Sequence, residues 1–140
     1  MKRYFYVFIF LVSLASCEKE KSKKKTEEFI IPKQSEMAAL MNEMFHESEL
    51  IKQKVLKGET PENFPERFLK IHTATLTDPS DRNDEFKAFS DVYLANFERV
   101  FEASKDSLQA QYNTAINSCI ACHKTTCIGP IPRIKKLLIQ

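Results

Sequence analysis

The chain has 140 residues, of which 43% are hydrophobic and 29% charged, so it is long enough for one small globular domain. It has only 2 glycines and neither a Gly-x-x-x-x-Gly-Lys-Ser/Thr nor a Gly-x-Gly-x-x-Gly sequence, which argues against a nucleotide-binding loop. If an N-terminal segment containing Lys2 and Arg3 is removed, 19 of the 21 basic residues remain and equal the 19 acidic ones. The net charge of the remaining chain is then zero, which excludes nucleic acid as the default partner.

The N-terminus has the features of an export signal. Lys2 and Arg3 precede an almost wholly apolar run over residues 4–14. This run is too short for a membrane-spanning helix, which needs about 20 residues, but it suits the hydrophobic region of a signal peptide. A Leu-Ala-Ser-Cys sequence follows and ends at Cys17; it resembles the lipobox of bacterial lipoproteins. The resemblance implies that residues 1–16 are a lipoprotein signal peptide and that Cys17 is lipidated. The alternative is a signal peptide, cleaved in the ordinary way or left uncleaved, in which Cys17 is incidental.

Both alternatives take the chain out of the cytoplasm. The lipoprotein resemblance implies a cell-envelope protein that faces the periplasm and is lipid-anchored to the inner or the outer membrane. Residues 17–34 then form a lipid-anchored charged linker, because their mixed charges lack the apolar periodicity needed to bury surface. Contact of Lys21 and Lys23–Lys25 with anionic lipid is an alternative, although a solvated linker is the simpler interpretation.

Two helices are expected in the first half of the domain. The first begins at Ser35, a typical N-cap, and ends at Gly58, which favours a left-handed C-cap. Its apolar residues recur at helical spacing and are Met37, Leu40, Met41, Met44, Ile51 and Val55. The second is expected to open at Thr60-Pro61, unless Pro65 shifts its start by one turn. Its apolar positions are Phe64, Phe68, Ile71 and Leu76.

Two more helices follow a polar turn at residues 77–83. The third, from residue 84 to about 104, carries Phe86, Phe89, Tyr93, Phe97 and Phe101. The fourth is expected to be capped by Asp106 or Ser107 and to present on one side Leu108, Tyr112, Ala115, Ile116, Cys119 and His123. No segment alternates with period two, so residues 35–128 are predicted to be an all-α antiparallel four-helix bundle. Residues 129–140 form a tail with no evident role.

The fourth helix contains the motif that carries chemistry. Residues 119–123 read Cys-Ile-Ala-Cys-His, the C-x-x-C-H attachment sequence of c-type haem. Cys119 and Cys122 share one helix face, so both thiols can add to the two vinyl groups of one porphyrin, and His123 becomes an axial ligand of the iron. Haem c is attached outside the cytoplasm, in agreement with the signal peptide.

Two other interpretations of the motif stay open. One is a disulfide or thiol-exchange pair, although a thioredoxin-like pair expects a βαβ setting that the sequence does not indicate. The other is a zinc site, for which Cys119, Cys122, His123 and Cys127 supply four ligands by count.

The placement of the motif resembles the cytochrome c prime and cytochrome c556 family. The matching features are a Met-rich first helix that leads into Leu56-Lys57-Gly58-Glu59, a Phe-rich third helix, and the haem motif on the last helix. The resemblance covers about residues 35–127 and implies a bundle that holds one covalent haem c. It departs from the family at Cys127, because the family usually has a basic residue four positions after the haem histidine. Cys127 is expected to be a small buried hydrophobe; the alternatives are an intermolecular disulfide and a redox-active thiol.

The sixth coordination position of the iron distinguishes two haem functions. In the family the residue at this position comes from the first helix, and the register favours Met41, with Met44 and Met37 as alternatives. A Met ligand suits electron transfer, whereas an open position binds small gases such as NO or CO. His46 is expected to face solvent. His72 is expected to be partly buried near a helix end, with a ligand role as the alternative.

Aromatic residues of the third helix are expected to surround the porphyrin, and they are Phe86, Phe89, Tyr93 and Phe97. The leading hypothesis is a periplasmic, lipid-anchored monohaem cytochrome c that transfers single electrons. The alternatives are a high-spin binder of NO or CO on the same fold and, from another class, a non-haem thiol or zinc lipoprotein that binds a protein. No carboxylate pair, Ser-His-Asp set or phosphate loop is apparent, so no enzymatic activity is predicted. The expected partners are an unidentified redox protein and the membrane, with a homodimer as a further option.

Overall fold

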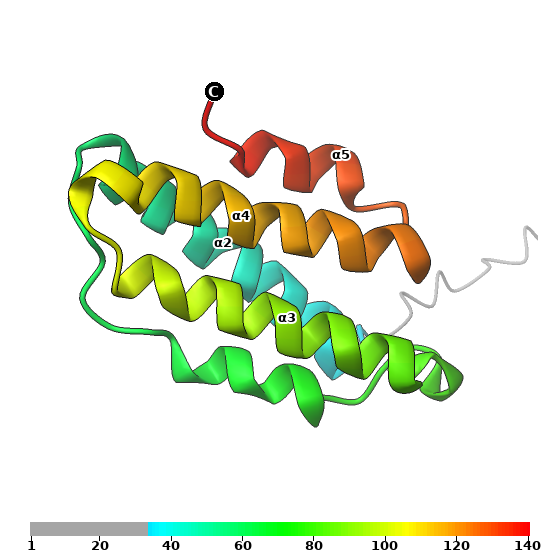
Figure 1. Cartoon of the computed structure of the whole chain (residues 1–140). Helices are drawn as coiled ribbons and strands as arrows, with labels where there is room; N and C mark the ends of the chain where they lie inside the picture. Colours follow the sequence, from blue (N-terminus) through cyan, green and yellow to red (C-terminus); the bar gives the residue numbers. More distant parts are fainter. Residues whose placement is uncertain (1–33) are drawn as a thin grey trace, which may run out of the picture. The chain divides into compact units, whose positions relative to one another are not determined.

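The computed structural model describes residues 34–140, and every regular element in this range is helical (Figure 1). In chain order the elements are α2 (Glu36–Leu56), the 3-10 helices η1 (Glu66–His72) and η2 (Pro79–Asp81), α3 (Asp84–Phe101), α4 (Lys105–Thr125), α5 (Ile131–Ile134) and the 3-10 helix η3 (Lys135–Leu137). The all-α prediction is confirmed for this part of the chain. The signal peptide, Cys17 and nearly all of the linker lie outside the described residues.

The long helix α2 begins and ends where its capping residues predict. The hydroxyl of Ser35 accepts a hydrogen bond of 3.1 Å from the backbone N–H of Ala38, and Gly58 has a φ of 73° just beyond the helix. Only glycine adopts this left-handed conformation without a steric cost, so the chain can turn sharply there. None of the helices in the described range is long and apolar enough to cross a bilayer.

The predicted second α-helix is wrong. Pro65 is extended, with a ψ of 94°, and only the seven residues of η1 follow it as a 3-10 helix. The physical reason is the proline: within an α-helix opened at Pro61, its ring would clash with the carbonyl four residues earlier. The 3-10 geometry places residues three apart on one face, and Phe68 and Ile71 are the two buried residues of η1.

The helices α3 and α4 pack against each other, and η1 packs on α3 and on α2. In Figure 1 the green η1 lies along α3, on the side away from α4. Asn83 caps α3 by accepting a hydrogen bond of 2.8 Å from the N–H of Phe86. The N-cap of α4 is Ser104 rather than Asp106 or Ser107, so that helix begins earlier than predicted.

The C-terminal tail is part of the core, although its sequence indicates no role. Its buried apolar residues are Ile134, Leu137 and Ile139. The ammonium of Lys52 on α2 donates hydrogen bonds of 2.8 and 2.9 Å to the carbonyls of Lys136 and Leu138. On the other side, the amide of Asn113 on α4 forms two hydrogen bonds, of 2.8 and 2.9 Å, with the backbone of Ile139. The segment is therefore fastened to both long helices.

Candidate functional site

A cavity of about 360 Å³ lies between α2, the first half of α3, the end of α4 and the C-terminal segment. This volume falls in the range of about 300–1,000 Å³ that is usual for ligand and cofactor sites. The side chains that line it are mainly apolar, and the sulfur-containing and ring-bearing ones are Met37, Met41, Met44, Phe45, Phe86, Tyr93, Cys119, Cys122, His123 and Cys127. One cavity therefore collects residues from three long helices.

The two thiols of the C-x-x-C-H motif face this cavity. Cys119 and Cys122 lie one turn apart near the end of α4, and both are partly buried. Burial, followed by the neighbouring Cys122 thiol, raises the pKa of Cys119 to about 12. Burial, followed by the negative charge of Glu85, also raises the pKa of Cys122. The cysteines at 119, 122 and 127 are free in the structure, so at neutral pH the pair at 119 and 122 presents two protonated thiols.

His123 is held with one ring nitrogen free. Its Nδ1 lies 2.9 Å from the carbonyl oxygen of Cys127. A carbonyl can only accept, so Nδ1 carries the hydrogen, and in the neutral ring Nε2 keeps its lone pair. Histidines that bind metals usually donate their other N–H to a carbonyl or carboxylate in this way. Two thiols one turn apart beside such an imidazole match the donor set of a c-type haem.

Cys127 itself is exposed, so the prediction that it is a small buried hydrophobe is wrong. The reason is that α4 ends at Thr125. Cys127 lies in the following turn, and not on a further turn of the helix where it would pack beneath His123. Cys127 lines the cavity, and its backbone carbonyl accepts a hydrogen bond from the imidazole of His123.

The three methionines of α2 all line the same cavity. Met37 and Met44 are buried, and Met41 between them is half-buried. Their spacing of four and three residues places them on one face of the helix. This cluster of thioethers is the part of the site that the sequence predicts from α2, and Met41 occupies its centre.

The expected aromatic wall is only half present. Phe86 and Tyr93, seven residues apart on one face of α3, line the cavity. Phe97 is fully buried and does not line the cavity; its ring stacks on Tyr93 and also contacts Phe64, Phe68 and Phe101. Phe89 lines a separate, shallow apolar groove over α3 and α4. The stripe at helical spacing therefore divides between a cavity, a core and an outer surface.

Sequence reasoning missed the residues that close the cavity from the C-terminal side. This side is lined by Pro130, Arg133, Ile134 and Leu137, although the sequence of the tail indicates no role. The only signal in the sequence was the spacing of three between the isoleucines at 131 and 134 and the leucine at 137. Asn42 and Phe45 of α2 also line the cavity, and neither is among the site residues predicted from the sequence.

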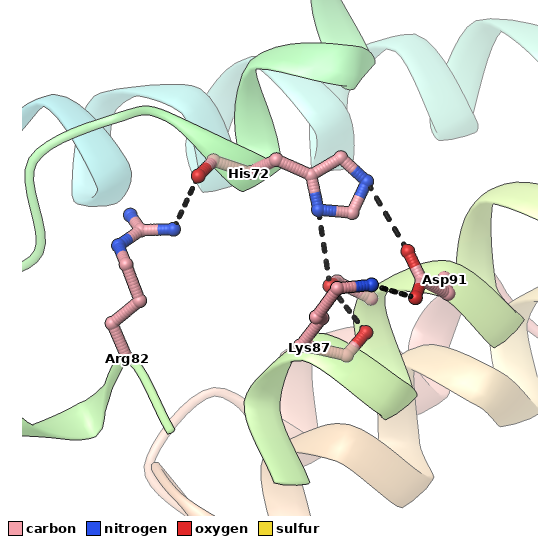
Figure 2. Close-up of polar contacts among 5 residues, drawn as sticks. His72, Arg82, Lys87 and Asp91 are labelled. Atoms are coloured by element: carbon pink, nitrogen blue, oxygen red, sulfur yellow. Dashed lines mark hydrogen bonds and ion pairs between the residues drawn. The ribbon is translucent and has the colours of Figure 1, made fainter. Parts of the chain in front are cut away.

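The two other histidines lie outside the cavity lining. His46 is exposed, as predicted, and pairs with Glu49 at 3.2 Å. Figure 2 shows the ring of His72 on η1 facing Asp91 of α3, and its Nε2 lies 3.5 Å from the Asp91 carboxylate. Its Nδ1 lies 3.5 Å from the hydroxyl of Ser90, also on α3. His72 is partly buried, as predicted, and this contact fastens η1 to α3.

The His72 cluster resembles a Ser-His-Asp set only superficially. Ser90 is fully buried, and its hydroxyl donates a hydrogen bond of 2.9 Å to the carbonyl of Lys87, so it cannot act as a nucleophile. The hydrogen bond from Lys87, at 2.8 Å, is the main cause that lowers the pKa of Asp91, and the charges of Lys87 and His72 add to it. Figure 2 also shows the guanidinium of Arg82 donating to the backbone carbonyl of His72. The cluster is a structural link.

A zinc site has different requirements from a haem site, because it needs four converging ligands. Among residues 34–140, no group of three or more His, Cys, Asp or Glu side chains is arranged to hold a metal ion. The haem donor set needs only two thiols and one imidazole on a single helix, and α4 supplies them. Comparison of the chain with protein-family models, with curated proteins and with solved structures gives no match.

Proposed function

We propose that the chain is a monohaem c-type cytochrome of the cell envelope that transfers single electrons. The observation that carries the proposal is one cavity lined by both thiols and the imidazole of the C-x-x-C-H motif and, from α2, by three methionines. A motif match alone would be compatible with side chains that point apart. Here both thiols and the imidazole line one mainly apolar cavity of about 360 Å³.

In this proposal Cys119 and Cys122 hold the haem covalently. Each thiol would form a carbon–sulfur bond to one carbon of a vinyl group and give its hydrogen to the other carbon, so no oxidant is needed. His123 would hold the iron through Nε2, because the carbonyl of Cys127 keeps the hydrogen on Nδ1. When bound, haem supplies a one-electron iron couple.

The methionine cluster favours electron transfer over gas binding. A thioether bound to the iron would take a position that a gas could otherwise occupy, and it would raise the reduction potential. Met41 is the proposed ligand because it lies at the centre of the cluster, with Met44 and Met37 as alternatives. The buried ring of Phe86 and the buried phenol of Tyr93 exclude water from the same space.

The arrangement of the chain supports the resemblance to cytochrome c prime and cytochrome c556. In this proposal α2, α3 and α4 are three members of a four-helix bundle, and η1 replaces the second α-helix. We further propose that Cys17 carries the lipid anchor and that residues 17–34 tether the domain in the periplasm. The proposed partner is a redox protein that exchanges electrons with this membrane-anchored domain.

The test is an optical spectrum of the full-length protein, purified from a host that attaches haem c. We expect one Soret chromophore per chain that stays with the polypeptide after denaturation. Cys119→Ser and Cys122→Ser should each weaken attachment, and the double variant should abolish it. Cys127→Ser is the matched control and should retain covalent haem, because its thiol is exposed and only its backbone carbonyl contacts His123.

Three outcomes would change the proposal. A wild-type protein without a chromophore, from cells that mature another c-type cytochrome normally, would refute the haem function. Stoichiometric zinc in that protein would support the zinc lipoprotein instead. A covalent haem that is high-spin and takes up CO at once would leave the cofactor in place and replace electron transfer by gas binding.

A further inference from the structure

The C-terminal segment places a positive charge at the edge of the cavity. Ile134 and Leu137 are buried against the long helices, and Arg133, which is exposed to solvent, lines the cavity beside them. Because Ile134 and the backbone bonds from Lys52 and Asn113 fix this segment, the Cα of Arg133 has little freedom to move.

The guanidinium of Arg133 is held by two side chains of α2. Its Nη1 donates a hydrogen bond of 2.7 Å to the amide oxygen of Asn42. Its central carbon lies 3.8 Å from the centre of the Phe45 ring, a stacked cation–π contact. Both partners line the cavity, so the planar group is oriented along its wall. A guanidinium has five N–H donors in a fixed fork, and these contacts use one of them.

The charge of Arg133 has no acidic partner in the described part of the chain. The ion pairs found between residues 34 and 140 involve other cations: His46, Arg67, His72 and Lys87. Apart from His123, the cavity is lined by only two ionisable charged side chains, Arg133 and Asp81. An oriented, unpaired guanidinium beside an apolar cavity is the arrangement that binds a carboxylate of a ligand.

We propose that Arg133 binds a propionate carboxylate of the haem, so that the C-terminal segment is part of the cofactor site. This inference rests on the proposed function, because haem is an apolar ring that carries two carboxylates on one edge. The thiols and His123 would fix the ring at α4, and Arg133 would fix its charged edge from the opposite chain segment. Asn42 and Phe45 act as positioning residues for the guanidinium.

The test compares Arg133→Gln with Lys135→Gln in the full-length holoprotein. Both variants remove one positive charge from the same segment, but Lys135 does not line the cavity. Reduction adds negative charge at the iron, so a nearby cation favours the reduced form. We expect Arg133→Gln to lower the equilibrium constant for reduction by up to about tenfold, which for a one-electron couple is about 59 mV. The control should change it much less.

A second measurement reports the carboxylate directly. Without Arg133 the freed propionate takes up a proton at higher pH, so the potential of Arg133→Gln should depend on pH in a range where the wild-type potential is flat. If the variant does not accumulate, nuclear magnetic resonance of the two carboxyl carbons in the wild-type holoprotein gives the answer. Ionisation of one carboxylate at least one pH unit below the other supports the contact.

Equal potentials and equal pH profiles for wild type, Arg133→Gln and Lys135→Gln would overturn the inference, as would two carboxylates that titrate together. Either result requires a covalent haem in the wild type, so it leaves the proposed function standing. A wild-type protein that contains no haem refutes the proposed function, and the inference falls with it.

Discussion

Leu137→Ala tests whether the C-terminal segment is part of the folded core. Leu137 is 3% exposed, packs with Ile134 and Ile139, and belongs to the η3 turn that contacts both α2 and α4. Replacement of a buried leucine by alanine costs about 2–5 kcal/mol, from the lost burial of the side chain and from the void that remains. Because Leu137 also lines the cavity, the new void joins existing space.

We therefore expect a loss near the lower end of that range in the haem-free chain, about 2–3 kcal/mol of the free energy of unfolding. In the holoprotein the loss should be larger, because a bound cofactor would occupy that space and the substitution would remove its contact. Against a total stability of about 5–15 kcal/mol for a domain, either loss is easily measured. Urea unfolding followed by circular dichroism gives it as a shift of the midpoint at constant slope.

Ile128→Ala is the control, since Ile128 is 71% exposed in the turn before α5. Substitutions at such positions usually change stability by less than about 0.5 kcal/mol. If Leu137→Ala unfolds at the same urea concentration as wild type and as the control, the C-terminal segment does not pack on the helices as described. The assignment of Arg133 to the cavity would then lose its basis.

Four further outcomes are expected. Met41→Ala should turn a low-spin ferric spectrum high-spin, lower the reduction potential and speed CO binding; a variant that stays low-spin would exclude Met41 as the ligand. Tyr112→Phe should cost about 1–2 kcal/mol in urea unfolding, because it removes a buried hydrogen bond of 3.0 Å to the α2 backbone; an unchanged midpoint would contradict that bond. The lowered pKa of Asp91 contributes stability that is present above about pH 4 and is lost as the pH falls through the pKa of Asp91 in the folded state. The free energies of unfolding of wild type and Asp91→Asn should therefore differ more at pH 6 than at pH 3. A difference that grows as the pH falls would refute this. Cys17→Ala should release a haem-containing protein from the membrane fraction, and wild-type amounts in the membrane would count against lipidation.

The parts of the fold that were predictable from sequence depend on local interactions. Ser35 and Gly58 mark the ends of α2 because a cap is formed by residues a few positions apart. The same locality explains why the motif on α4 and the methionines on one face of α2 are found from spacing alone. The second helix is not predictable in this way, because the spacing of its apolar residues suits both an α-helix and a 3-10 helix. Pro65 excludes an α-helix that opens at Pro61, but it does not determine which type follows.

The remaining features depend on contacts between distant segments. Phe97 follows Tyr93 by one helical turn, but it packs against Phe64 and Phe68 and does not line the cavity. Arg133 lies in a segment of four α-helical residues, too short to be stable on its own. The position of this segment is fixed by hydrogen bonds from Lys52 and with Asn113, which are distant from the tail in the sequence.

The hydrogen bond between His123 and residue 127 has a consequence for how this sequence can change during evolution. The acceptor is a main-chain carbonyl, which every amino acid possesses, so the imidazole keeps its orientation whatever side chain stands at 127. A basic residue there can thus be exchanged for cysteine without loss of that support. Insertions or deletions between Thr125 and Pro130 are a different matter, because they would move the carbonyl itself. Selection on this turn should therefore act on its length more strongly than on its composition.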